Sequence, residues 1–173
     1  MINTLMKRKS VRTYTGESIT DEELSIILKS ADASPVGLKQ YDTLHLTVIT
    51  NKDLLEKIET VAGAMFNKPD HHPLYGAPTF ILISSKNMPM MENVMYSNAA
   101  IMSHNISLAA TTLNIGSCYI WGATAAISKH TEILKELNLP EGFIPCCGVI
   151  LGKTNESFDE KEIPNRIAKS FIK

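Results

Sequence analysis

The chain has 173 residues, of which 44% are hydrophobic and 20% charged, with a formal net charge of −1. This length suits a single domain, residues 1–173, with a substantial core, and the nearly balanced charge argues against nucleic acid as a partner. The most apolar stretch is interrupted by the polar segment Ser103–Asn105, which argues against a membrane span, and the N-terminus lacks the apolar core of a secretory signal. We therefore expect a cytoplasmic protein that binds neither nucleic acid nor membranes.

The N-terminal segment combines a short helix with a dense group of cations. Ile2–Lys9 is predicted to form an amphipathic helix, and residues 7–12 hold four basic side chains around one serine. Two interpretations of this basic cluster are open. It is either a solvated run of charges, or a phosphate site in which arginine forks and the Ser10 hydroxyl donate hydrogen bonds.

A helix and a tight loop are predicted next. Thr20–Glu23 has the sequence of a capping box, and an apolar stripe follows it as far as Ala33. The helix must end there because the residue before Pro35 is disfavoured in helical geometry. Residues 34–40 then form a loop that is either an ordinary turn or part of a binding site.

Two strands are predicted in the following segment, at Leu44–Thr50 and at Thr79–Ser85. Between them, Asn51 can cap a helix over Asp53–Ala64. Phe66–Pro78 is polar and contains prolines, so it is predicted to be a loop. The second strand is continuously apolar, which indicates burial on both of its faces.

Neither the histidines nor the cysteines follow a metal-binding pattern. His71 and His72 are neighbours with no third ligand close in sequence. Cys118 and the adjacent pair Cys146–Cys147 make neither a disulfide framework nor a spaced zinc set. We expect no metal site, and thiols that are reduced and mostly buried.

The longest apolar segment, Val94–Ile115, is predicted to form a helix with apolar side chains on nearly every face. Such a helix must be buried all round, either as an ordinary core helix or against a second copy of the chain. It should end at Asn114–Gly116, where glycine supplies the positive φ of a C-terminal cap. Gly116 and Gly122 bracket the apolar strand Ser117–Trp121, a pattern that often marks close approach of backbone to a ligand.

The C-terminal part is predicted to contain one helix, one strand and a tail. Ser128 can cap a helix that runs to Leu137, and Phe143–Gly152 is predicted to be a strand. The tail Lys153–Lys173 is polar and lacks a core stripe. It is therefore either disordered or docked on something outside its own core.

The chemistry available along the chain is that of binding and not of side-chain catalysis. The sequence has no G-x-S-x-G elbow and no G-x-G-x-x-G loop, and no local motif places a pair of acidic residues for catalysis. It offers cations and hydroxyls near both ends and an aromatic strand between glycines in the middle. This combination suits a phosphorylated, flat cofactor that performs the reaction itself.

The order of several motifs resembles the nitroreductase family of flavoproteins. Arg8–Arg12 is similar to the R-x-S-x-R signature of that family, and Ser34–Gln40 resembles its A-P-S-x-x-N-x-Q segment. Tyr75–Pro78 before a strand, Leu113–Cys118 after a buried helix and Leu137–Phe143 before another strand follow the family order. The resemblance extends over almost the whole chain.

The resemblance implies an α+β fold with a central, mostly antiparallel sheet flanked by helices, in an intertwined homodimer. It implies FMN as cofactor and NADH or NADPH as co-substrate, with a nitroaromatic, quinone or similar small-molecule acceptor reduced in a ping-pong cycle. Residues 153–173 would be an extension that reaches the partner subunit. The alternatives are a non-catalytic FMN store or redox sensor, and a flavin-dependent dehalogenase or oxidase on the same fold.

The same resemblance implies which residues contact the flavin, with no side chain acting as a catalytic acid or base. The basic cluster and the tail would hold the phosphate and ribityl end of the flavin. An asparagine and the aromatic strand would contact its ring, and the 34–40 loop of the other subunit would line the flavin as well. Backbone N–H groups of Trp121 and Gly122 would lie near flavin N5. The cofactor-binding set is Arg8, Lys9, Ser10, Arg12, Pro35, Val36, Gly37, Lys39, Asn67, Tyr119, Ile120, Trp121, Gly122, Lys153 and Arg166.

Three positions depart from the family pattern. Val36 stands where serine is usual, and Lys39 stands where asparagine is usual. Trp121 occupies a position that is often smaller or acidic, which narrows the expected substrate pocket. The chain is also short, without the insertions that form substrate lids in longer relatives.

Overall fold

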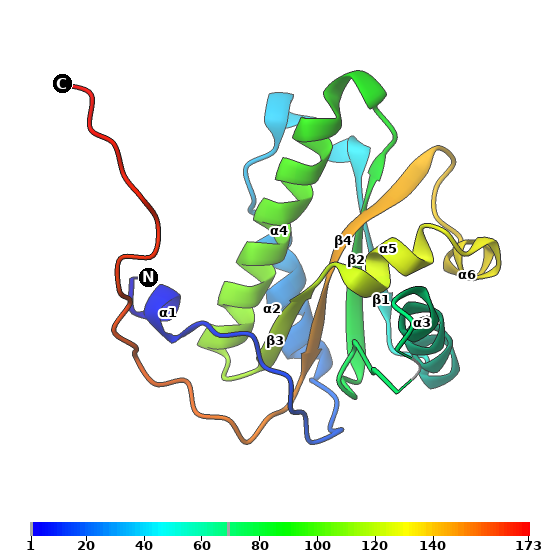
Figure 1. Cartoon of the computed structure of the whole chain (residues 1–173), viewed down its shortest axis with the longest axis horizontal. Helices are drawn as coiled ribbons and strands as arrows, with labels where there is room; N and C mark the ends of the chain where they lie inside the picture. The colour runs from blue at the N-terminus through cyan, green and yellow to red at the C-terminus, as the bar shows by residue number, and fades with distance from the viewer. Residues whose placement is uncertain (1, 69) are drawn as a thin grey trace.

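The computed structural model describes residues 2–68 and 70–173, and in them four strands form one antiparallel sheet (Figure 1). The strand order is β1-β2-β4-β3, and each neighbouring pair is antiparallel. β2 is buried along its length except for the final lysine, as its continuous apolarity predicted. The strands are β1 (Leu44–Ile49), β2 (Thr79–Lys86), β3 (Gly116–Ile120) and β4 (Phe143–Gly152).

Helices cover both faces of this sheet and enclose two hydrophobic cores (Figure 1). α2 and α4 pack on one face, around Ile81, Ile106 and Val149, while α3, α5 and α6 pack on the other, around Phe80 and Leu82. The predicted α+β class is thus confirmed. The helices are α1 (Ile2–Lys7), α2 (Asp21–Asp32), α3 (Lys52–Met65), α4 (Glu92–Thr112), α5 (Gly122–Ile127) and α6 (Thr131–Leu137), with single 3₁₀ turns at Gly37–Lys39, Tyr41–Thr43 and Pro89–Met91.

Two of the three N-terminal helix caps predicted from the sequence are present, and the third prediction is wrong. Thr20 and Glu23 form the reciprocal capping box of α2, and Asn51 accepts the N–H of Leu54 at 3.0 Å to cap α3. Ser128, expected to start a helix, instead ends α5, a helix that the pattern missed because Trp121 offers no capping oxygen. The following helix is capped by Nδ1 of His130.

α4 differs from the predicted helix in the residue at which it ends and in how completely it is buried. It ends at Thr112, and the left-handed residue beyond it is Asn114, with φ of 55°, whereas Gly116 already belongs to β3. Gly116 is required there for contact, because a Cβ would lie 2.9 Å from Val11 Cγ1. Ile101 on the outer face is 37% exposed, so burial all round is not achieved within one chain.

The C-terminal segment first follows the N-terminal segment and then leaves the body of the protein. Lys153 O accepts the N–H of Thr15 at 3.0 Å, and Thr154 Oγ1 donates to Thr13 O at 2.8 Å. Figure 1 shows the remaining tail passing α1 and ending away from the sheet. Apolar side chains in it are exposed, with Phe171 at 83%. The tail therefore has no core of its own, as the sequence indicated.

The three cysteines are buried, and none forms a disulfide. Burial raises the pKa of the Cys146 thiol to about 11 and that of Cys147 to about 12. The two thiols are therefore protonated and unreactive at neutral pH. Within residues 2–68 and 70–173, every helix is too short or too polar to span a bilayer.

Candidate functional site

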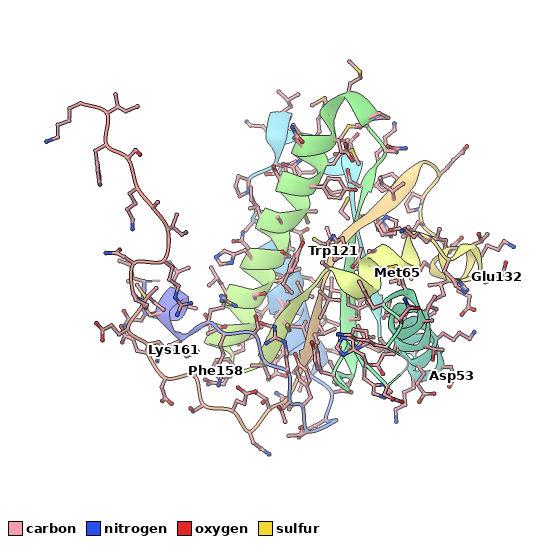
Figure 2. The ribbon with its side chains drawn as sticks, viewed as in Figure 1. Asp53, Met65, Trp121, Glu132, Phe158 and Lys161 are labelled. Atoms are coloured by element: carbon pink, nitrogen blue, oxygen red, sulfur yellow. The ribbon has the colours of Figure 1, made fainter. Side chains whose placement is uncertain are left out.

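A cleft of about 360 Å³ opens where the end of β3 meets the loop that follows α3. Its floor is formed by residues 118–120 of β3, and its opposite wall is the loop between α3 and β2. Trp121, 60% exposed, stands at the junction of β3 and α5 (Figure 2). The lining residues are Arg12, Phe66, Lys68, His71, Pro73, Tyr75, Cys118, Tyr119, Ile120, Trp121 and Gly122.

The two walls of the cleft touch at Gly122 and Phe66. A Cβ on Gly122 would lie 3.0 Å from Cε2 of the Phe66 ring. Glycine at this position therefore leaves room for the Phe66 ring of the loop. The sequence pattern predicted a close approach to a ligand here, but not the contact with this ring. Gly122 also opens α5, so its N–H group has no acceptor within that helix.

Arg12 enters the cleft from the N-terminal segment. The preceding residue, Val11, is buried and donates its N–H to Ser117 O at 2.9 Å, which fixes this segment against β3. The guanidinium carbon of Arg12 lies 5.7 Å from the centroid of the Tyr75 ring. The His71 ring meets the same tyrosine edge-on, with 6.1 Å between centroids.

Other cations of the predicted cofactor set have partners within the chain. Lys9 Nζ lies 2.7 Å from Glu156 Oε2 and 5.6 Å from the centroid of the Phe158 ring, which belongs to the C-terminal segment beside α1 (Figure 2). Lys153 forms an ion pair with Glu23 at the start of α2.

Three further polar members of that set, Arg8, Ser10 and Arg166, lie outside the cleft lining. Arg8 and Ser10 stand on the N-terminal segment that leads to the cleft, and Arg166 is exposed on the tail. Among the ion pairs found in the described part of the chain, none involves Arg12. Arg12 is therefore the residue of the basic cluster that lines this cavity, and it has no acidic partner in the described part of the chain.

Asn67 and the aromatic strand take different positions relative to the cleft. Asn67 has φ of 53° and donates its N–H to Ala64 O at 3.0 Å, so it ends α3 as a turn residue. Tyr119 and Ile120 line the cleft, although the Ile120 side chain is packed in the core. Phe66, His71, Pro73 and Tyr75 also line it, and none of these four belongs to the predicted cofactor-binding set.

The loop of residues 34–40 lies away from the cleft and is clamped by α4. Asn98 Oδ1 accepts the N–H of Gly37 at 3.1 Å, and Asn105 Nδ2 donates to Ser34 Oγ at 2.8 Å. Leu38 and Lys39 both have φ of 56°, a left-handed conformation that is unfavourable for side chains other than glycine. Pro35, Val36, Gly37 and Lys39 are thus presented away from this chain's own cavity.

A family model described as "Nitroreductase family" matches residues 5–153, and the chain belongs to this family. It is similar to an FMN reductase (NADPH) from Bacillus subtilis, with 25% identity over 87% of this chain, and it spans 64% of that relative's length. It is also similar to an oxygen-insensitive NADPH nitroreductase from Salmonella typhimurium, with 25% identity over 92% of this chain and 68% of the relative.

Solved structures share the fold over nearly the full length. A nitroreductase with bound FMN from Bacteroides fragilis is 26% identical, with a TM-score of 0.82 over 98% of this chain and 97% of that one. A nitroreductase from Desulfitobacterium hafniense, 24% identical, has a TM-score of 0.86 over 99% of this chain and 97% of its own. The sheet and its two helical layers are therefore those of the nitroreductase fold.

Proposed function

We propose that this chain is an FMN-dependent oxidoreductase that uses NADH or NADPH to reduce nitroaromatic, quinone or similar acceptors. The observation that carries the proposal is the cleft itself. It joins an unmatched guanidinium, Arg12, to the glycine-flanked end of β3 at Trp121–Gly122. The relatives named above, an FMN reductase and an NADPH nitroreductase, support the same activity.

The residues of the cleft fit a flat, phosphorylated cofactor. Arg12 supplies a fork for a phosphate, and Arg8 and Ser10 stand on the same segment as further donors. The aromatic rings of Phe66, Tyr75 and Trp121 provide flat apolar walls. Among the described residues that line the cavity there is no carboxylate to repel a phosphate.

Each residue of the proposed site binds or orients a partner, and none transfers a proton. When bound, FMN supplies the redox chemistry, taking two electrons from NAD(P)H and passing them to an acceptor that binds afterwards in a ping-pong cycle. A quinone acceptor gains these two electrons with two protons, of which NAD(P)H supplies one and solvent the other. The N–H of Gly122 has no acceptor within α5 and would donate to the cofactor ring, and Trp121 would limit the size of the acceptor.

The proposal includes a homodimer, supported by apolar surface left open in one chain. Ile101 on α4 is 37% exposed, and Val94 and Leu108 lie seven residues away on either side of it, along the same line of the helix. A second copy packed on α4 would cover this line and give the 153–173 tail a surface to bind. The strained Pro35–Lys39 loop would then reach the partner's flavin.

Free thiols support a cytoplasmic location for this dimer, because reduced cysteines persist in reducing compartments.

Anaerobic mixing of the FMN-loaded protein with NADH or NADPH tests the activity. We expect the flavin absorbance to bleach and to return when a quinone or nitroaromatic compound is added. Flavin that stays oxidised with both nucleotides would instead identify an FMN store or sensor. A colourless protein that added FMN cannot reconstitute would contradict the cofactor assignment itself.

A further inference from the structure

We propose that the acceptor of this enzyme is a flat aromatic compound carrying an anionic group, such as a carboxylate, and that Lys68 and His71 bind that group. This inference rests on the proposed function, because it names the class of compound that the same cleft accepts. The positions of the charged side chains around the cavity support it.

Lys68 and His71 belong to one turn of the cleft wall. The N–H of His71 donates to Lys68 O at 2.9 Å, and both residues line the cavity. The turn is held to α3 because the N–H of Lys68 donates to Gly63 O, also at 2.9 Å. Two nitrogen-bearing side chains are thus anchored on the wall that faces the end of β3.

The charge of Lys68 has no counter-ion within the described part of the chain. The ion pairs found there involve Lys9, Lys57, His72, Lys135 and Lys153. Among the described residues that line the cavity, none carries a carboxylate. A lysine alone at the surface is ordinarily solvated, but a lysine on the wall of a cavity without acidic residues creates a positive potential inside it.

Arg12 and Lys68 serve different anions. The guanidinium of Arg12 lies over Tyr75 and is aimed, in the proposed function, at the cofactor phosphate. This leaves Lys68 and His71 for the second ligand. The rings of Phe66, Tyr75 and Trp121 in the same lining favour an aromatic body on that ligand.

The geometry of NAD(P)H favours the acceptor as the source of the anion. The phosphates of a dinucleotide lie far from its nicotinamide ring, which is the part that reacts. The anionic group should therefore be attached directly to the flat ring.

Binding of benzoate and benzamide to the oxidised FMN-loaded protein tests the inference without turnover. The two molecules have nearly the same shape, and only benzoate is charged. By titration calorimetry we expect benzoate to bind about tenfold more tightly, the effect of one charge-assisted hydrogen bond. Lys68→Met should bring the ratio close to one and Lys68→Arg should retain most of it. Lys129→Met, at an exposed lysine outside the cleft, is the matched control.

The two half-reactions separate the possible sources of the anion. 4-Nitrobenzoate and 4-nitrobenzamide should differ in kcat/KM by a similar factor, and Lys68→Met should remove the difference. Equal affinity for benzoate and benzamide in the wild type would overturn the inference. So would a Lys68→Met variant that changed only the rate of flavin reduction by NADPH relative to NADH, or only the flavin potential. If neither nucleotide bleaches the flavin, the proposed function fails, and the benzoate titration still decides the anionic preference.

Discussion

Arg12 lies over the ring of Tyr75, with its guanidinium carbon 5.7 Å from the ring centroid. Tyr75 itself has φ of 53°, and Gly76 after it has φ of 71°. A bulky residue in this left-handed region is an outlier, and its strain is maintained by the surrounding contacts. The aromatic ring is thereby held against the Arg12 guanidinium at the edge of the cleft, and it orients that cation.

Replacing Tyr75 tests this orienting role. Tyr75→Leu removes the ring and should weaken FMN binding by about 0.5–1 kcal/mol, the size of an exposed cation–π contact. Tyr75→Phe keeps the ring and should retain the wild-type affinity. Quenching of FMN fluorescence on binding measures both. A phenylalanine variant as weak as the leucine variant would show that the hydroxyl, and not the ring, is required.

Arg12 should contribute more than its aromatic partner. Arg12→Ala should weaken FMN binding by about 1.5–3 kcal/mol, the range for a hydrogen bond to a charged group. Arg12→Lys keeps the charge but loses the fork, so an intermediate affinity is expected. The Arg12 side chain is exposed, and the thermal stability of the cofactor-free protein should change little. Unchanged FMN affinity in Arg12→Ala would move the phosphate site away from this cleft.

The sequence predicted those parts of the fold that depend on neighbouring residues. The strands followed from apolar runs, and the caps at Thr20 and Asn51 followed from side chains that bond the adjacent backbone. α5 was missed because a glycine and a tryptophan at its start give no such signal. The cleft wall was missed for another reason. Phe66 contacts Gly122 at the start of α5, and Tyr75, in a left-handed turn, contacts Arg12. Periodicity in the sequence does not predict such tertiary contacts.

Association through α4 is the next prediction. Wild-type protein should be a dimer by light scattering, and Ile101→Asp should place an unpaired charge in its interface and abolish it. In one chain Ile101 is 37% exposed, so the charge remains solvated in a monomer. Lys129→Asp, an exposed position on the opposite face of the sheet, is the control and should remain dimeric. A wild-type monomer at micromolar concentration would contradict this assembly.

Gly148 in β4 should be required for packing. A Cβ there would lie 2.1 Å from Phe80 Cε2 and 3.1 Å from Ile81 O, and Phe80 is fully buried. Gly148→Ala should therefore lower the free energy of unfolding by about 3 kcal/mol, at the upper end for overpacking. Gly76→Ala, which meets no atom within 4 Å, should cost only about 1 kcal/mol of backbone strain. Urea unfolding compares the two, and equal losses would show that the core around Phe80 adapts.

The ion pair of Glu23 with Lys153 gives the stability a defined dependence on pH. The hydrogen bond from Lys153 and the backbone N–H of Thr20 lower the pKa of Glu23 from its ordinary value of 4.5. A carboxyl whose pKa is lower in the folded state stabilises the protein above pH 4.5, and this contribution is lost as the pH falls through the folded value.

Glu23→Gln keeps the capping box but removes the charge. It should lower the free energy of unfolding at pH 7 by up to about 1 kcal/mol, as for a partly exposed pair. The difference from wild type should shrink below pH 4.5 and vanish once the wild-type carboxyl is protonated. Thr20→Ala removes the cap oxygen and should be destabilising across the whole range, by about 1 kcal/mol. Chemical unfolding between pH 3 and pH 7 measures these differences, and a Glu23→Gln effect that persisted unchanged at pH 3 would show that the charge is not its cause.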